Sequence, residues 1–135
     1  MTLRLQSDLS DEEELTAREV VGAALAIHRA LGPGYLEGFY RKAMCVELKA
    51  RRLAFECEKA VEVSYRGELL GTHRVDLIVQ GLLVVELKAV ERLDTVHRNQ
   101  VVAYLKATKL RLGLLVNFNT ALLKHGLQRV VLSSP

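Results

Sequence analysis

The sequence predicts an α/β fold in which one mixed β-sheet is flanked by helices, with an extra helix at the N-terminal end. Apolar residues recur at helical spacing up to about residue 52 and again near residue 100. Between these stretches, apolar and polar residues alternate with the period of two that strands show. The resulting order is two helices, three strands, a helix and a strand, followed by a final edge strand. The 135 residues fit one domain whose core needs no disulfide or metal.

Two helices are predicted before the strands. The first begins at Ser10, because the serine and Glu13 can satisfy each other's free amides as a capping box. It ends near Leu31, where Gly32-Pro33-Gly34 stops the helix. The second covers about residues 36–52. The side chains expected to face other elements in this helix are Phe39, Tyr40, Ala43, Cys45, Val46 and Ala50.

The remaining elements follow from changes in the period. After residue 52, the alternation of apolar and polar residues is typical of a half-buried strand. A third helix is predicted up to about Ala107, with Asp94 or Thr95 as its cap. The predicted strands cover residues 55–65, 72–79, 82–88, 112–117 and 127–132.

Three charged residues interrupt otherwise apolar strands: Asp76, Glu86 and Lys88. Burying an unpaired charge is costly, so these side chains require a bound metal ion or a mutual ion pair. Glu-x-Lys alone is a weak signal, because Glu47-Leu48-Lys49 has the same spacing within the second predicted helix. Because Glu86 and Lys88 lie in a predicted strand, they, and not Glu47 and Lys49, are the candidate site residues.

The register of the hairpin decides whether Asp76 joins the other two charges. Glu86 and Lys88 share one face of their strand because side chains alternate. A two-residue turn at Gln80-Gly81 would place Asp76 on the opposite face. A three-residue loop, Val79-Gln80-Gly81 with a left-handed Gly81, places all three on one face, and we expect this loop.

Two carboxylates and a lysine on one face are the side chains that metal-assisted phosphodiester hydrolysis uses. Carboxylate oxygens suit Mg²⁺, and also Mn²⁺, since such an ion keeps several waters and takes further ligands from phosphate. The ion lowers the pKa of a bound water and neutralises charge that develops on the phosphate. Lys88 can then position that water, and the carbonyl of Leu87 is a further candidate ligand.

Three more side chains are candidates for the same site. Gln100 and Tyr104 are four residues apart on the third predicted helix, so an amide and a phenol lie on one side of it and can orient a water or a phosphate oxygen. Glu37, in the pattern Gly34-x-x-Glu37-x-x-Tyr40, opens the second helix and can add a carboxylate to the ion. A glutamate in a first helical turn is also expected simply to complement the helix dipole.

With these residues, the sequence resembles the family of proteins named for their GxxExxY motif, within the PD-(D/E)XK nuclease superfamily. The resemblance extends over about residues 15–131 and depends on four segments: residues 34–40, 74–77, 85–89 and 113–119. It implies a restriction-endonuclease-like αβββαβ core, metal ligands at Asp76 and Glu86, a catalytic lysine at Lys88 and an accessory acid at Glu37.

Two details of the resemblance concern the site. Residues 100–104 resemble the QxxxY motif of RecB-like members, which are DNA exonucleases or helicase-linked nucleases. Val75 occupies the position of the proline in the motif's name, and this position is not a metal ligand.

Other function classes lack their signatures. The chain has no Walker loop, nucleophile elbow, dinucleotide fingerprint or histidine pair at metal-ligand spacing. Its formal net charge of +3 permits contact with a polyanion without requiring it. Two cysteines without a CxxC pair, and no leader pattern or membrane-length apolar run, predict a cytoplasmic protein.

The sequence therefore predicts a Mg²⁺- or Mn²⁺-dependent nuclease that acts on DNA. We expect phosphates to be held by basic residues such as Arg41, Lys42, Arg92 and Arg98, or by a homodimer or partner protein. Two alternatives stay open. One is a non-catalytic nucleic-acid-binding or protein-interaction module that keeps the fold and uses the charges structurally. The other is action on RNA, against which no sequence feature speaks.

Overall fold

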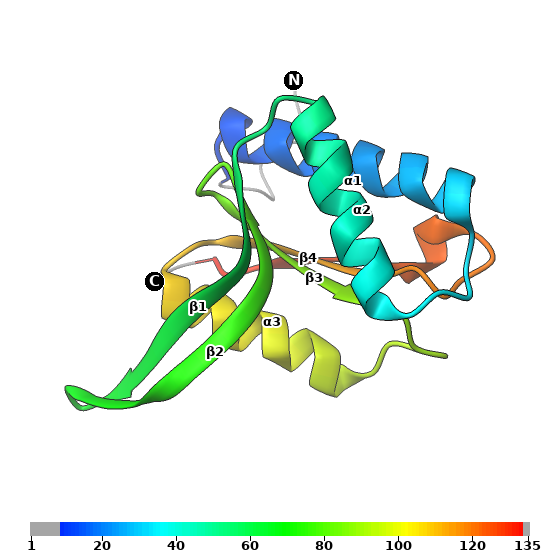
Figure 1. Ribbon diagram of the computed structural model, residues 1–135. Coiled ribbons are helices and arrows are strands. Elements are labelled where there is room, and N and C mark those ends of the chain that lie inside the picture. The colour runs from blue at the N-terminus through cyan, green and yellow to red at the C-terminus, as the bar shows by residue number, and fades with distance from the viewer. Residues whose placement is uncertain (1–8, 134–135) are drawn as a thin grey trace, which may run out of the picture.

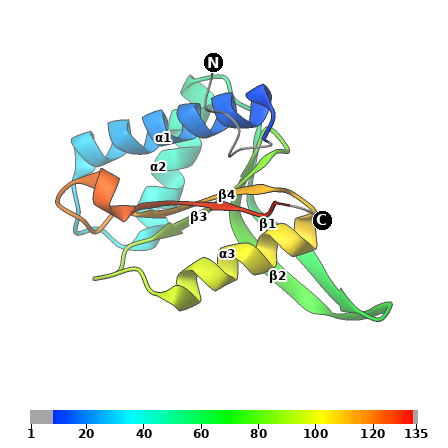
Figure 2. The ribbon, with the colours of Figure 1, turned by 180° about the vertical axis from the view of Figure 1, so that it is seen from behind.

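A mixed five-stranded sheet lies between α1 and α2 on one face and α3 on the other in the computed structural model, which describes residues 9–133 (Figures 1 and 2). The strand order is β1-β2-β3-β4-β5. β3 and β4 are parallel, and the other neighbouring strands are antiparallel. The predicted fold class, a mixed sheet flanked by helices, is confirmed. The elements are α1 (Asp11–Leu31), α2 (Glu37–Ala50), β1 (Phe55–Tyr65), β2 (Glu68–Val79), β3 (Leu83–Lys88), α3 (Thr95–Thr108), β4 (Leu112–Asn117), the 3-10 helix η2 (Leu123–Gly126) and β5 (Leu127–Val131).

The helices pack on the two faces of the sheet through two apolar cores. One lies between the sheet and the α1 and α2 layer, and the other lies between the sheet and α3. α3 packs closely on β4 at Gly113, which has no side chain. A Cβ built there would lie 2.6 Å from Cγ1 of Val101. None of the helices within residues 9–133 is both long enough and apolar enough to cross a membrane.

α2 buries a different face from the one expected. Tyr40 is buried as predicted, but Phe39 and Val46 are 57% and 70% exposed. Ala50 is exposed as well, so the prediction for these three residues was wrong. Met44 and Leu48 are fully buried in their place. Tyr40, Met44 and Leu48 are spaced four residues apart and form one stripe along the helix, which α1 and the sheet cover.

β1 and β2 form a long hairpin that projects from the sheet (Figures 1 and 2). β2 begins at Glu68, four residues before the predicted start, because the ladder with β1 continues to the turn. The expectation of a half-buried β1 was wrong, since Val61 is the buried residue of this strand. Cys57 is exposed on it, and Cys45 on α2 is intermediate.

A buried tyrosine fixes the connection between α1 and α2. The Tyr40 hydroxyl donates to the Gly32 carbonyl oxygen at 2.6 Å and accepts from the backbone N–H of Tyr35 at 3.2 Å. Its ring stacks on Phe118, with 4.4 Å between the ring centroids. The loop before α2 is therefore anchored to the core.

Candidate functional site

The two acidic candidates lie where β2 and β3 separate. The last residues paired between these strands are Leu77 and Val85, and Asp76 and Glu86 come next. The backbone N–H of Asp76 donates to Glu86 Oε1 at 3.4 Å, and that of Leu87 donates to Asp76 Oδ2 at 2.8 Å. Both side chains are largely buried, at 8% and 5% exposure. The carboxylates thus take the place of the next ladder hydrogen bonds.

The loop that sets this register has the predicted length but different residues. Val79 pairs with Leu83, which leaves Gln80, Gly81 and Leu82 in the loop instead of residues 79–81. Val79 stays in the strand because its side chain is fully buried. Gly81 is left-handed, with φ of 65°, as predicted. A three-residue loop of either composition places Asp76 on the same face as Glu86 and Lys88. The observed loop brings Asp76 opposite Glu86, whereas the predicted loop would have brought it opposite Val84.

Lys88 joins the acidic pair to α3. Its Nζ lies 3.5 Å from Glu86 Oε2 and donates a hydrogen bond of 2.9 Å to Gln100 Oε1. Tyr104 lies one helical turn further along α3 and is 4% exposed. Burial raises the pKa of Tyr104 to about 12, and the carboxylates of Glu86 and Asp76 add to the shift. The phenol therefore keeps its proton and is available to donate a hydrogen bond.

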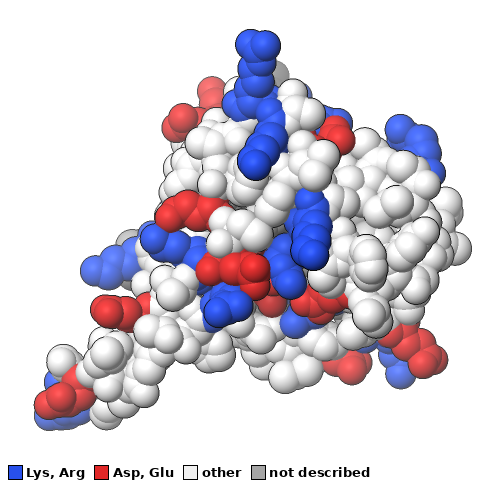
Figure 3. Space-filling model, in the orientation of Figure 1, with Lys and Arg blue, Asp and Glu red and all other residues white. Residues whose placement is uncertain are grey.

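Arg41 connects α2 to the carboxylates. Its Nη1 lies 3.6 Å from Asp76 Oδ1 and 3.9 Å from Glu37 Oε1, and its Nε lies 3.9 Å from Glu58 Oε1. Glu58 also pairs with Arg74 at 3.0 Å. Figure 3 shows acidic and basic side chains gathered together at the centre of this face, between α2 and the base of the hairpin. Sequence reasoning missed Glu58, which lies in β1 between Cys57 and Lys59, the residues paired with Leu77 and Val75 on either side of Asp76.

Repulsion between carboxylates marks this cluster. Burial raises the pKa of Glu86 to about 7, with a further contribution from Asp76, while Lys88 acts in the opposite direction. Burial also raises the pKa of Glu37, and Asp76 again contributes. Glu37 is therefore part of the same electrostatic environment. The cations present, Lys88 and Arg41, compensate the negative charge only in part.

The donor set fits a hard divalent cation that takes few ligands from protein. Within the described chain, no group of three or more histidine, cysteine, aspartate or glutamate side chains is arranged to enclose a metal ion. Asp76 and Glu86 instead offer adjacent carboxylate oxygens whose repulsion a cation would relieve. Mg²⁺ commonly uses one or two protein carboxylates and completes its shell with water and phosphate. The ligand roles of Leu87 and Glu37 stay predictions.

Asn117 positions the chain after Lys88. This side chain, 1% exposed at the end of β4, accepts from the backbone N–H of Val90 at 3.0 Å and donates to its carbonyl oxygen at 2.9 Å. It therefore fixes the start of the connection from β3 to α3. Sequence reasoning missed this role, for which the available signal was a polar residue at the end of an apolar strand.

The basic residues expected at phosphates occupy different places. Arg41 lies in the cluster, while Lys42 and Arg92 are exposed. Arg98 donates to the backbone oxygen of Arg129 at 3.4 Å. No common phosphate surface emerges from these four residues within the part of the chain that is described.

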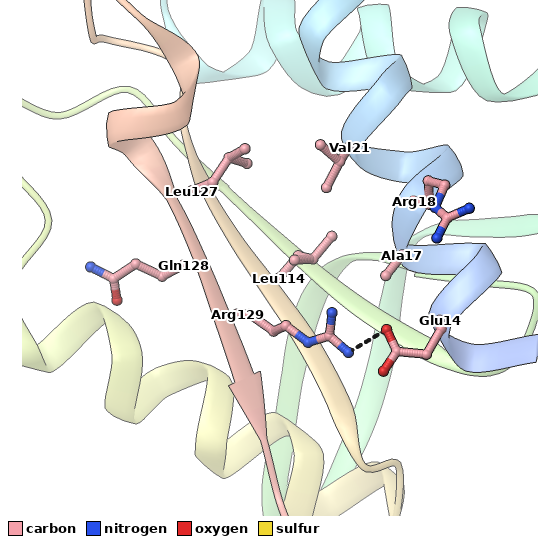
Figure 4. A pocket seen from close by; sticks show the side chains of 8 residues that line it. All are labelled: Glu14, Ala17, Arg18, Val21, Leu114, Leu127, Gln128 and Arg129. Carbon is pink, nitrogen blue, oxygen red and sulfur yellow. Dashed lines mark ion pairs between the residues drawn. The ribbon is translucent and has the colours of Figure 1, made fainter. Parts of the chain in front are cut away.

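A separate cavity of about 360 Å³ lies between α1 and the strands β4 and β5 (Figure 4). Apolar side chains such as Val21, Leu114 and Leu127 line it, and Arg129 of β5 pairs with Glu14 of α1 at 2.7 Å. It contains none of the predicted site residues. The acidic cluster is therefore distinct from this hollow.

Comparison with known protein families places the chain in one superfamily. The family model of the PD-(D/E)XK nuclease superfamily matches residues 14–130, a span that includes every residue of the cluster. Searches among curated proteins and among solved structures gave no significant match. On the family match, the chain belongs to the PD-(D/E)XK nuclease superfamily.

Proposed function

We propose that the protein is a divalent-metal-dependent nuclease that hydrolyses phosphodiester bonds in DNA. One observation carries the proposal: Asp76, Glu86 and Lys88 converge where β2 and β3 separate. Superfamily membership supports nuclease chemistry at such a site. Burial and Asp76 keep the pKa of Glu86 raised despite Lys88, so a bound cation would stabilise its charged form.

The acidic side chains would hold Mg²⁺ or Mn²⁺. Asp76 and Glu86 are the proposed ligands, with the Leu87 carbonyl and Glu37 as additional oxygen donors. When bound, the ion supplies a water of lowered pKa and positive charge near the phosphate. The hydrogen bond from Leu87 N–H to Asp76 Oδ2 holds that carboxylate in place before any ligand arrives.

Lys88 is the proposed positioning group for the attacking water. Gln100 accepts a hydrogen bond from its ammonium group, which fixes the direction of the side chain. In hydrolysis, the water oxygen forms a bond to phosphorus while one phosphorus–oxygen bond breaks. The Lys88 ammonium can hold the water and stabilise the phosphate oxygens, and the protonated Tyr104 phenol is a second donor nearby.

The test is cleavage of linear and circular DNA with Mg²⁺, with Mn²⁺ and with chelator. We expect metal-dependent cleavage by the wild type and a loss of at least about 100-fold in Lys88→Met. Lys106→Ala, which removes an exposed lysine of α3, is the matched control and should cut normally. Cleavage of circular DNA would identify endonuclease action.

Metal binding separates the proposal from its alternative. Calorimetric titration with Mn²⁺ should show binding that is lost in Asp76→Asn and Glu86→Gln. If the wild type neither binds Mn²⁺ nor cuts DNA, the non-catalytic module is the better description. If it cuts RNA but not DNA under the same conditions, the substrate part of the proposal is wrong.

A further inference from the structure

Two exposed aromatic rings lie at the start of α2. Tyr35 and Phe39 are 48% and 57% exposed, and their ring centroids are 5.7 Å apart at an interplanar angle of 48°. We call this pair the aromatic rim. Leu36 between them is 77% exposed. Large apolar side chains that remain in water at one place indicate a contact surface.

The backbone that carries the aromatic rim is anchored to the core although the rings are exposed. Tyr35 donates its backbone N–H to the Tyr40 hydroxyl, which donates to the Gly32 carbonyl oxygen, and the Tyr40 ring stacks on Phe118. Phe39 is part of the first turn of α2. Because the backbone is already ordered, a ligand that packs on the rings has only the side chains to order.

The aromatic rim lies at the start of the helix that also carries Glu37 and Arg41 of the acidic cluster. Phe39 and Glu37 are two residues apart and so point to different sides of α2. The Glu37 carboxylate is 3.9 Å from Arg41, which in turn pairs with Asp76. The beginning of α2 lies beside the end of β3 in both ribbon views (Figures 1 and 2). A strand that stacks on the rings would therefore cross the start of α2 to reach the carboxylates.

The charge along α2 favours a polyanion as the occupant. Lys42 and Lys49 are exposed. Lys42 follows Phe39 by three residues and Lys49 follows Lys42 by seven, so the two lysines share one face of α2, next to that of Phe39. Glu47, the acidic residue of this stretch, is engaged by Arg51 at 2.9 Å. Aromatic rings for bases next to lysines for phosphates are the combination that binds unpaired nucleic acid strands.

We infer that the aromatic rim is a base-stacking surface for single-stranded DNA, so that an unpaired strand is the form of substrate delivered to the cluster. In a duplex, the bases are stacked on one another and their faces are not available to these rings. Lys42 and Lys49 then contact the phosphates of the same strand. The inference rests on the proposed function only in taking DNA as the polymer.

The test measures binding in chelator, where no cleavage occurs. Fluorescence anisotropy with a labelled single strand of about 12 nucleotides, and with the duplex of the same sequence, compares the wild type with Tyr35→Ala and Phe39→Ala. We expect each variant to lose about tenfold in affinity for the single strand and little for the duplex. Phe39→Trp should retain single-strand binding. Tyr65→Ala, at an aromatic residue of the hairpin that is 65% exposed, is the matched control and should bind as the wild type does.

Two results would overturn the inference. One is unchanged single-strand affinity in Tyr35→Ala and Phe39→Ala. The other is a wild-type dimer in sedimentation that becomes a monomer in these variants, which would assign the rim to a second copy of the chain. The two proposals can be told apart. If the wild type cuts DNA but the rim variants bind the single strand normally, the nuclease proposal holds and the rim inference is wrong. If binding depends on the rim but no metal supports cleavage, the rim inference holds and the nuclease proposal is wrong.

Discussion

The charges of Asp76 and Glu86 are partly compensated by cations from two different elements. Lys88 of β3 pairs with Glu86, and Arg41 of α2 pairs with Asp76. This arrangement stabilises a buried acidic pair without neutralising it, because the pKa of Glu86 remains well above that of a free carboxyl. The behaviour of the cluster should therefore respond to pH and to the removal of either cation.

Glu86 should make the protein less stable as the pH rises. Its pKa is about 7 in the folded state against a reference of 4.5, because burial and Asp76 disfavour the charged form. A folded-state pKa above the unfolded value gives a contribution to stability that is complete below 4.5 and is lost as the pH rises through about 7. We expect Glu86→Gln, which cannot ionise, to exceed the wild type in free energy of unfolding by up to roughly 3 kcal/mol near pH 8. Urea unfolding in chelator tests this, and equal stabilities at that pH would contradict it.

Arg41 should compete with a metal ion for Asp76. Its guanidinium lies 3.6 Å from Asp76 Oδ1, where a cation would also bind. We expect Arg41→Gln to bind Mn²⁺ about fivefold more tightly, a change that corresponds to one partly exposed ion pair. Arg41→Lys keeps the charge and serves as the control. Calorimetric titration measures both variants, and an affinity for Mn²⁺ in Arg41→Gln that equals the wild-type value would show that no competition exists.

Much of the cluster could be predicted from local sequence, and the rest required contacts between distant elements. Asp76, Glu86 and Lys88 stood out because charge is costly in an apolar strand, and helical spacing placed Gln100 with Tyr104. Arg41 and Glu58 come from α2 and β1, and no sequence spacing links them to the others. Glu47-Leu48-Lys49, the second Glu-x-Lys match in the sequence, lies on α2, as its helical pattern indicated.

At the scale of elements, local signals were the reliable ones. The capping box formed as expected, since the backbone N–H of Glu13 donates to Ser10 Oγ at 3.0 Å and that of Ser10 donates to Glu13 Oε1 at 2.7 Å. The buried face of α2 was not predictable in the same way, because apolar residues occur on both of its faces. Packing against α1 and the sheet decides which of them is covered.

The close approach of α3 to β4 depends on Gly113. A side chain there would meet Val101 Cγ1 at 2.6 Å, so α3 and its Gln100 would have to move. We expect Gly113→Ala to lower the free energy of unfolding by about 1–3 kcal/mol. In a Val101→Ala background, the same substitution should cost clearly less, because the opposing methyl group is gone. Thermal or urea unfolding of the four proteins measures this coupling, and full additivity would contradict the proposed clash.

At the scale of the whole molecule, the distribution of charge matters more than its total. The net charge of +3 is small, but acidic and basic side chains are concentrated around the cluster (Figure 3). The exposed face of α2 adds Lys42 and Lys49 beyond that centre. A bound strand would therefore meet its counter-charges along α2.

Binding of single-stranded DNA should weaken with salt through these lysines. Each phosphate contact contributes about 0.7 to the slope of log affinity against log salt concentration for single strands. We expect Lys42→Ala and Lys49→Ala each to reduce the magnitude of that slope by about 0.7 and to do so for any base sequence. Anisotropy titrations between about 50 and 200 mM salt measure it. An unchanged slope in both variants would remove α2 from the path of the strand.

The separation of β2 and β3 at the cluster also limits how this chain can evolve. Asp76 Oδ2 satisfies the backbone N–H of Leu87, so the residue that we propose as a metal ligand also completes the sheet. A descendant that abandons hydrolysis is still bound to supply an acceptor at this position. Asparagine meets that demand without charge, whereas alanine or valine leaves a buried amide without a partner. Inactive descendants of this chain should therefore carry asparagine at position 76 and retain the fold.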